Sequence, residues 1–194
     1  MRNPAWIAIT LLVLGGCAGG PPRGAAPPRC AYADAPRTSA PAWVCGAPLA
    51  GLAVSAVGSA PPSAAGYGAM KTQAASAGRD WLVDHLRAFA GRRLQAYAAA
   101  QGALDADRLR DMQASVEGYI TKTTVLGSRV YRTATSPSGT LYVLVGLSDS
   151  LARRQLRDAL RASMQNEPAL WRPLLAGRDG AGLAAEIAGQ GGGG

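Results

Sequence analysis

Three cysteines are the residues of this chain best suited to covalent chemistry. Cys17 follows two glycines and the apolar run of residues 5–14. Small residues leave room for a peptidase, and cleavage there would place the Cys17 thiol beside a new terminal amine. The positive start at residues 1–3 is typical of a secretory signal, and the apolar run is too short to span a bilayer as a helix. Residues 1–16 are therefore predicted to be a signal peptide.

The sequence Leu14-Gly15-Gly16-Cys17 resembles the lipobox of bacterial lipoproteins. In that class the thiol receives a diacylglycerol and the new amine is acylated. Each buried CH₂ contributes roughly 0.8 kcal/mol, and two or more chains anchor a protein stably. Cys17 is thus predicted to be the lipidation site, against an ordinary secretory signal or an uncleaved anchor in which this cysteine is incidental. Ala18 stands where an Asp would favour the inner membrane, so the resemblance implies the outer membrane.

Cys30 and Cys45 remain as an even pair in an exported, oxidising setting. A disulfide between them would close a short loop and contribute about 3 kcal/mol in the chain-entropy description. It would tie the end of a tether to the first strand of the domain. Two free thiols or an intermolecular bridge are the alternatives, and the spacing fits neither a redox CxxC motif nor a zinc knuckle.

No other residues form a recognisable catalytic or metal-binding pattern in the sequence. His85 is the single histidine; it lies on a predicted apolar helical stripe, and spacing identifies no partner for it. The glycines do not follow a strand in a nucleotide-binding pattern, and no serine lies in a GxSxG context. Asp105 and Asp107 are typical of a helix start. We therefore expect a protein that is not an enzyme and takes no cofactor or metal.

Arg153, Arg157 and Arg161 recur at every fourth position of a predicted helix and so share one face. That face is a candidate contact for lipid headgroups, glycan-linked carboxylates or an acidic partner; a solvated surface is the plainer alternative. The total charge is +8, and loss of residues 1–16 removes one Arg and no acid, which leaves +7. Nucleic acid, another common partner of basic chains, would not meet an exported, lipidated protein.

The chain divides into four parts by composition. Residues 17–42 are rich in Gly, Pro, Ala and Arg, which predicts a disordered tether after lipidation. The folded domain is predicted at residues 43–165, with its first strand at 52–60. Residues 166–194 are predicted to be a C-terminal extension, in which a short apolar stretch docks on the domain and the terminal glycines are flexible.

Helical periodicity begins after Ser63, and residues 87–98 are ambiguous between continued helix and a poor strand. Asp105 starts a second helix, and a third follows near residue 149. The predicted inward stripe of the first helix comprises Met70, Ala74, Ala77 and Trp81.

A hairpin joins the second and third helices. One strand is predicted at residues 125–135, and residues 136–139 carry Pro and Gly at the positions of a type I turn. The return strand at 140–147 is apolar on both faces, so it is predicted to be central. The fold is therefore predicted to be α+β, with a small antiparallel sheet of three or four strands packed against helices.

Three segments together resemble the family of twenty-kilodalton LPP lipoproteins: residues 56–60, the helix around residues 74–82 and the strand at 141–145. The resemblance covers roughly residues 43–163. It implies a small envelope domain on an outer-membrane lipid anchor and supplies no catalytic residues. Members similar to flagellar lipoprotein P assemble into rings beneath the outer membrane, so the resemblance also implies a homo-oligomer or an envelope protein partner.

Two functions follow as expectations. The first is a lipid-anchored outer-membrane protein, facing the periplasm, with a structural or interaction role as an oligomerising envelope scaffold, flagellum-associated in one version. The alternative is a monomeric periplasmic module that binds peptidoglycan or an envelope partner through the arginine face.

Overall fold

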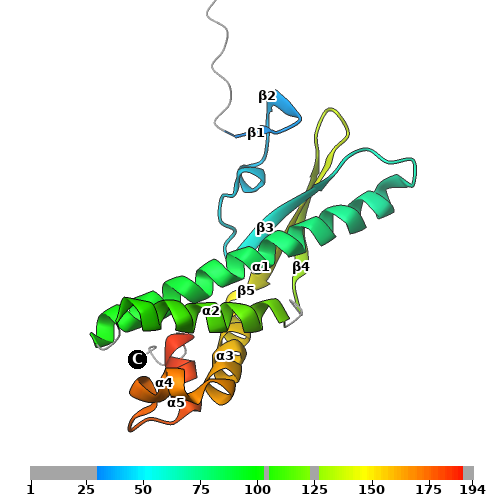
Figure 1. The fold of residues 1–194 in the computed structure, drawn as a ribbon. Coiled ribbons are helices and arrows are strands. Elements are labelled where there is room, and N and C mark those ends of the chain that lie inside the picture. The colour runs from blue at the N-terminus through cyan, green and yellow to red at the C-terminus, as the bar shows by residue number, and fades with distance from the viewer. Residues whose placement is uncertain (1–29, 103–104, 123–126, 190–194) are drawn as a thin grey trace, which may run out of the picture.

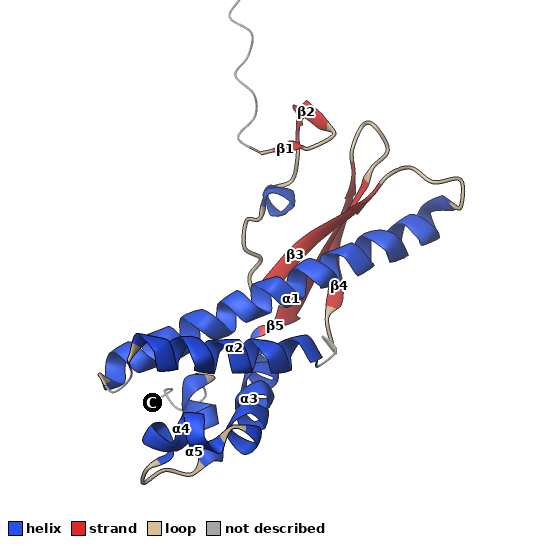
Figure 2. Ribbon diagram, viewed as in Figure 1, coloured by secondary structure: helices blue, strands red, loops and turns tan. Residues whose placement is uncertain are grey.

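The structure, a computed structural model, describes residues 30–102, 105–122 and 127–189. The predicted signal peptide, Cys17, the tether as far as residue 29 and the C-terminal residues 190–194 lie outside the described residues. Within them, five α-helices and two antiparallel sheets give the predicted α+β class (Figures 1 and 2).

A three-stranded antiparallel sheet with the order β3-β5-β4 forms the centre of the molecule. Its strands are β3 (Leu52–Ala60), β4 (Arg129–Thr135) and β5 (Leu141–Ser148). Every residue of β5 except the last is buried, which confirms that this strand, apolar on both faces, is central. The predicted start of the preceding strand at residue 125 lies outside the described residues.

The long helix α1 (Gly66–Gln101) runs diagonally across the sheet (Figure 1). It has 36 residues, so the ambiguous stretch 87–98 is helix. Gly102 ends it with a φ of 60° and donates its N–H to the Ala98 carbonyl at 3.0 Å. This left-handed cap is the usual role of glycine after a helix.

Two glycines bring α1 and β3 into backbone contact. A Cβ built on Gly58 of β3 would lie 2.0 Å from the Ala74 carbonyl oxygen and 2.3 Å from the Gly78 nitrogen. A Cβ built on Gly78 would lie 2.9 Å from Cγ2 of Val145 in the central strand. Neither position has room for a side chain, so this glycine pair sets the distance between helix and sheet.

The glycine contact also fixes which stripe of α1 faces inward. Because Gly78 lies against the sheet, the buried line continues through Leu82 and Leu86, both fully buried. The predicted continuation through Ala77 and Trp81 was wrong: Trp81 is 59% exposed. Alanines and other apolar residues surround this part of the helix, so periodicity alone did not separate the two adjacent stripes.

Four further helices pack below and beside α1 (Figure 1). Asp105 accepts a hydrogen bond from the backbone N–H of Arg108 at 2.7 Å, which confirms it as the start of the second helix. The helices are α2 (Ala106–Lys122), α3 (Asp149–Asn166), α4 (Pro168–Leu175) and α5 (Gly180–Ile187).

The C-terminal segment belongs to the domain core, so the predicted division at residue 165 cuts through that core. Trp171 of α4 is fully buried, and its indole N–H donates to the Ser163 hydroxyl at 2.8 Å. Leu183 and Ile187 of α5 join the same apolar core. The predicted docking of a short apolar stretch was right, but it understated how much of the core this segment supplies.

The N-terminal module, which we define as residues 30–45, is folded, so the prediction of a tether reaching residue 42 was wrong. Its elements are β1 (Ala31–Tyr32), β2 (Ala35–Ser39) and the 3₁₀ helix η1 (Ala42–Cys45). The module lies at the end of the molecule that carries the β4–β5 turn, whereas α4 and α5 lie at the opposite end (Figure 1). The sequence did not predict this module because it consists largely of prolines and small residues. Contacts with residues far away along the chain stabilise it.

Candidate functional site

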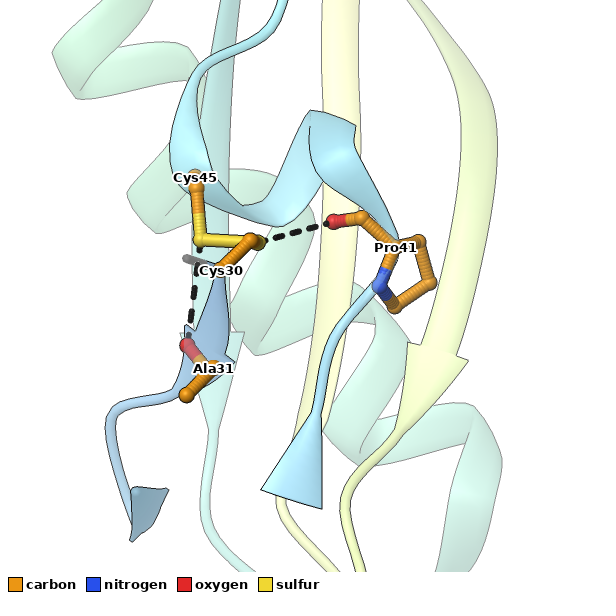
Figure 3. Close-up of a disulfide and its surroundings, with 4 residues drawn as sticks. All are labelled: Cys30, Ala31, Pro41 and Cys45. Atoms are coloured by element: carbon orange, nitrogen blue, oxygen red, sulfur yellow. Dashed lines mark hydrogen bonds between the residues drawn. A yellow bond between two sulfur atoms is a disulfide. The ribbon is translucent and has the colours of Figure 1, made fainter. Parts of the chain in front are cut away.

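Cys30 and Cys45 form the predicted disulfide, and it closes the N-terminal module (Figure 3). Their Cα atoms lie 5.8 Å apart across a sequence separation of 15. The Sγ of Cys30 lies 3.4 Å from the Pro41 carbonyl oxygen, and that of Cys45 lies 3.8 Å from the Ala31 carbonyl oxygen. The bridge joins the residue before β1 to the last residue of η1, rather than reaching β3 as predicted. A loop of this size gives about 3 kcal/mol of stabilisation.

Asp34 fastens the module to the β4–β5 turn. Its carboxylate accepts hydrogen bonds from the hydroxyls of Ser136 and Ser138, and from the Tyr142 hydroxyl at 2.7 Å. Tyr32 lies against Tyr142 with ring centroids 5.3 Å apart. A carboxylate and an aromatic ring therefore hold the module, from positions that are more than 100 residues away from their partners along the chain.

The hydrogen bonds at Asp34 also set its protonation. The Ser136 hydroxyl, followed by those of Ser138 and Tyr142, holds the pKa of Asp34 well below its usual range. Burial raises the pKa of Tyr142, and the Asp34 carboxylate raises it further. Both groups therefore keep their hydrogen-bonding forms, ionised carboxylate and neutral phenol, at neutral pH.

We expect the attachment of the module to weaken as the pH falls below about 4. A carboxyl group whose folded pKa is depressed stabilises the fold fully above its unfolded pKa, about 3.9 for Asp, and loses that contribution as the pH falls. Hydrogen exchange of the β1 and β2 amides, corrected for intrinsic rates, should show lower protection at pH 2.5 than at pH 7. Asp34→Asn should lose most of this pH dependence, whereas Asp158→Asn, at an exposed position on α3, should retain it. Equal protection of the unaltered protein at both pH values would contradict the role of Asp34.

A groove of about 390 Å³ lies between the N-terminal module, β3 and α1. One wall is η1, which contributes Trp43 and Val44, and residues 52–57 of β3 form the floor. The opposite wall belongs to α1, where the lining positions are four, three and four residues apart and therefore lie on one helix face. Those side chains are Trp81, His85, Ala88 and Arg92.

The groove combines aromatic faces with basic groups. Trp81, His85 and Arg92 are exposed and Trp43 is half-buried. The Nδ1 of His85 lies 2.8 Å from the Trp81 carbonyl oxygen; because a carbonyl can only accept, Nδ1 carries the hydrogen, and in the neutral ring Nε2 is an acceptor. The described residues that line the groove include no Asp or Glu. This arrangement suits binding of an anionic ligand with flat apolar faces.

Sequence reasoning missed this groove although one signal for it was present. Trp81 and His85 are one turn apart on α1, but the predicted stripe turned them towards the sheet. The structure turns both outward, so the predicted placement of His85 on the apolar stripe was wrong. The sequence could not reveal the wall that contains Trp43, because the Cys30–Cys45 disulfide and the Asp34 hydrogen bonds place Trp43 beside the groove.

The structure does not bring the three predicted arginines together as one open face. Arg153 donates to the Gly189 carbonyl at 2.6 Å and pairs with Asp149, so it ties α3 to the end of α5. Arg157 is half-buried, and Arg161 is exposed. A contact of this face with lipid headgroups or an acidic partner therefore stays a prediction, and Arg161 is the arginine best placed to make it.

Within the described residues, no three His, Cys, Asp or Glu side chains come close enough to hold a metal ion. No helix in the described part of the chain has the length and apolar character needed to cross a membrane. No protein-family model matches the chain, and neither the curated proteins nor the solved structures give a match.

Proposed function

We propose that this protein is an outer-membrane lipoprotein that faces the periplasm and acts as an oligomerising envelope scaffold. In a narrower form of this proposal, the scaffold is associated with the flagellum. Residues 14–17 support the lipid anchor, and the Cys30–Cys45 disulfide fits an oxidising compartment. The observation that carries the structural role is the fastening of the N-terminal module. A disulfide and the Asp34 hydrogen bonds join the point where the tether enters to the central sheet.

Exposed apolar surface supports an interaction role. The first turns of α1 extend past the sheet (Figure 1), and Tyr67 there is 54% exposed. Trp81 is 59% exposed further along the same helix. These two aromatic side chains on one helix are available for contact with a partner.

A monomeric binding module for peptidoglycan or an envelope partner is the second candidate. The groove with Trp43, Trp81 and Arg92 favours it more than the predicted arginine face does, since Arg153 is engaged within the chain. The two candidates share the anchor and differ in whether copies of the chain associate.

Replacing Cys17 tests the anchor on which both candidates depend. We expect Cys17→Ser to abolish fatty-acid labelling and to move the protein from the membrane fraction to a soluble fraction, because no thiol remains to accept the diacylglycerol. The control is the double substitution Cys30→Ser with Cys45→Ser, which removes the bridge and should leave labelling and membrane attachment intact. A Cys17→Ser protein that stays in the membrane fraction and keeps its label would refute the anchor.

The oligomeric state separates the two candidates. Light scattering of the detergent-solubilised full-length protein should show a mass several times that of one chain. A strict monomer at high concentration would count against the scaffold and leave the binding module. Any soluble form made for this purpose should begin at residue 30, because a start at residue 43 removes Cys30, Tyr32 and Asp34.

A further inference from the structure

We propose that the groove between the N-terminal module and α1 binds a carboxylate-bearing glycan, the chemistry of a peptidoglycan strand. A sugar ring would stack on the indole of Trp81, against the wall that Trp43 provides, and a carboxylate of the strand would pair with Arg92. The inference rests on the proposed periplasmic location and names the ligand class of the second candidate function.

Charge complementarity selects an anionic ligand. The charged side chain that lines the groove is Arg92, and the described lining includes no carboxylate that would neutralise it. Arg92 is exposed, so its guanidinium can donate two parallel hydrogen bonds to a carboxylate. The chain without residues 1–16 carries a net charge of +7, which adds a favourable field for an anionic polymer.

The aromatic and polar groups favour a glycan over an acidic peptide. The C–H faces of a sugar ring match the electron-rich face of an indole, and its hydroxyls can both donate and accept. His85 offers an acceptor at Nε2, and Ser55 on the groove floor offers a hydroxyl that does both. A volume of about 390 Å³ is within the range of small-ligand sites and suits a short segment of a glycan.

The position of the groove fits a ligand near the anchor. Trp43 belongs to the module that begins at Cys30. An extended chain advances roughly 3.5 Å per residue, so residues 17–29 could reach roughly 45 Å from the lipid. The groove would then lie in the layer of the periplasm next to the membrane, where a fixed polymer is a suitable partner for a tethered domain.

Co-sedimentation with purified peptidoglycan sacculi tests the proposal, using the full-length lipoprotein in detergent micelles with its disulfide intact. We expect Trp81→Ala and Arg92→Gln each to weaken binding by roughly tenfold, since each removes one aromatic or charge-assisted contact. Trp81→Phe should retain more of the binding than Trp81→Ala. The matched control is Arg154→Gln, an exposed arginine outside the groove, which should bind as the unaltered protein does.

Competition identifies the chemical class of the ligand. Soluble disaccharide-peptides released from sacculi should displace the protein, and a neutral chitin tetrasaccharide should do so more weakly. Poly-glutamate should not displace it at the same concentration of carboxylates. Displacement by poly-glutamate without displacement by either glycan would overturn the proposal in favour of an acidic protein partner.

Absence of sedimentation, or sedimentation unaffected by Trp81→Ala and Arg92→Gln, would also overturn the proposal. Neither outcome would change the fractionation of the Cys17→Ser protein. The failure of the glycan site can therefore be distinguished from the failure of the proposed anchor.

Discussion

Gly58→Ala is expected to destabilise the domain by about 3 kcal/mol or more. The new Cβ would lie 2.0 Å from the Ala74 carbonyl oxygen and 2.3 Å from the Gly78 nitrogen. Both are backbone atoms that cannot rotate away, so α1 would have to separate from β3 along its packed length. Urea unfolding of the full chain, followed by far-UV circular dichroism, should show a large fall in the midpoint concentration.

Gly118→Ala is the matched control for this substitution. Gly118 lies within α2, where an added Cβ would meet nothing within 4 Å. Alanine is the better helix former by about 1 kcal/mol, so this variant should be as stable as the unaltered protein or more so. A Gly58→Ala protein with an unchanged midpoint would show that helix and strand do not approach as closely as described.

Trp171→Ala is expected to cost about 3–5 kcal/mol, because it empties a fully buried indole site. The substitution also removes the hydrogen bond from the indole to the Ser163 hydroxyl. Ser163 would keep its 2.6 Å contact with the Ser115 hydroxyl, so most of the cost comes from the cavity. The fall in the thermal midpoint, measured by calorimetry, provides the test.

Trp81→Ala removes the same side chain type from an exposed position and should change stability by no more than about 0.5 kcal/mol.

Truncation after residue 165 is a second check on the role of the C-terminal helices. The shortened chain should fail to fold, since it loses Trp171, Leu183 and Ile187 from the core. A truncated protein with undiminished stability would restore the predicted separate extension.

Local chemistry explains the parts of the fold that the sequence predicted correctly. Residues 136–139 have Pro and Gly at fixed turn positions, and in the structure the Gly139 N–H donates to the Ser136 carbonyl at 2.9 Å. β5 has apolar residues on both faces, which predicts a central strand whatever its neighbours are. The buried Met112, Val116 and Ile120 in α2 have the spacing of one helix face.

Contacts between distant residues explain the parts that were missed. The N-terminal module looked like a tether because its stability comes from Tyr32 and Asp34, whose partners are on β5 and in the turn before it. The inward stripe of α1 was wrong by one position because backbone contact with Gly58 decides between adjacent apolar rows. The groove forms because the N-terminal module packs on the sheet and because Trp81 faces outward from α1. Neither composition nor periodicity could therefore have located it.

The disulfide between Cys30 and Cys45 also determines how the domain responds to mechanical force. A pull on the chain before Cys30 passes through the two sulfur atoms to Cys45 and then towards β3, so the hairpin and η1 carry no tension. Without the bridge the same pull would strip the module from the sheet and straighten the intervening chain. The span between these cysteines would then grow from 5.8 Å to roughly 50 Å, at about 3.3–3.6 Å for each of the 15 residue steps. The redox state of this one bond therefore sets how far the chain before Cys30 can be pulled from the core: when oxidised, the bond holds the two cysteines together, and when reduced, it allows them to separate by roughly 45 Å more under tension.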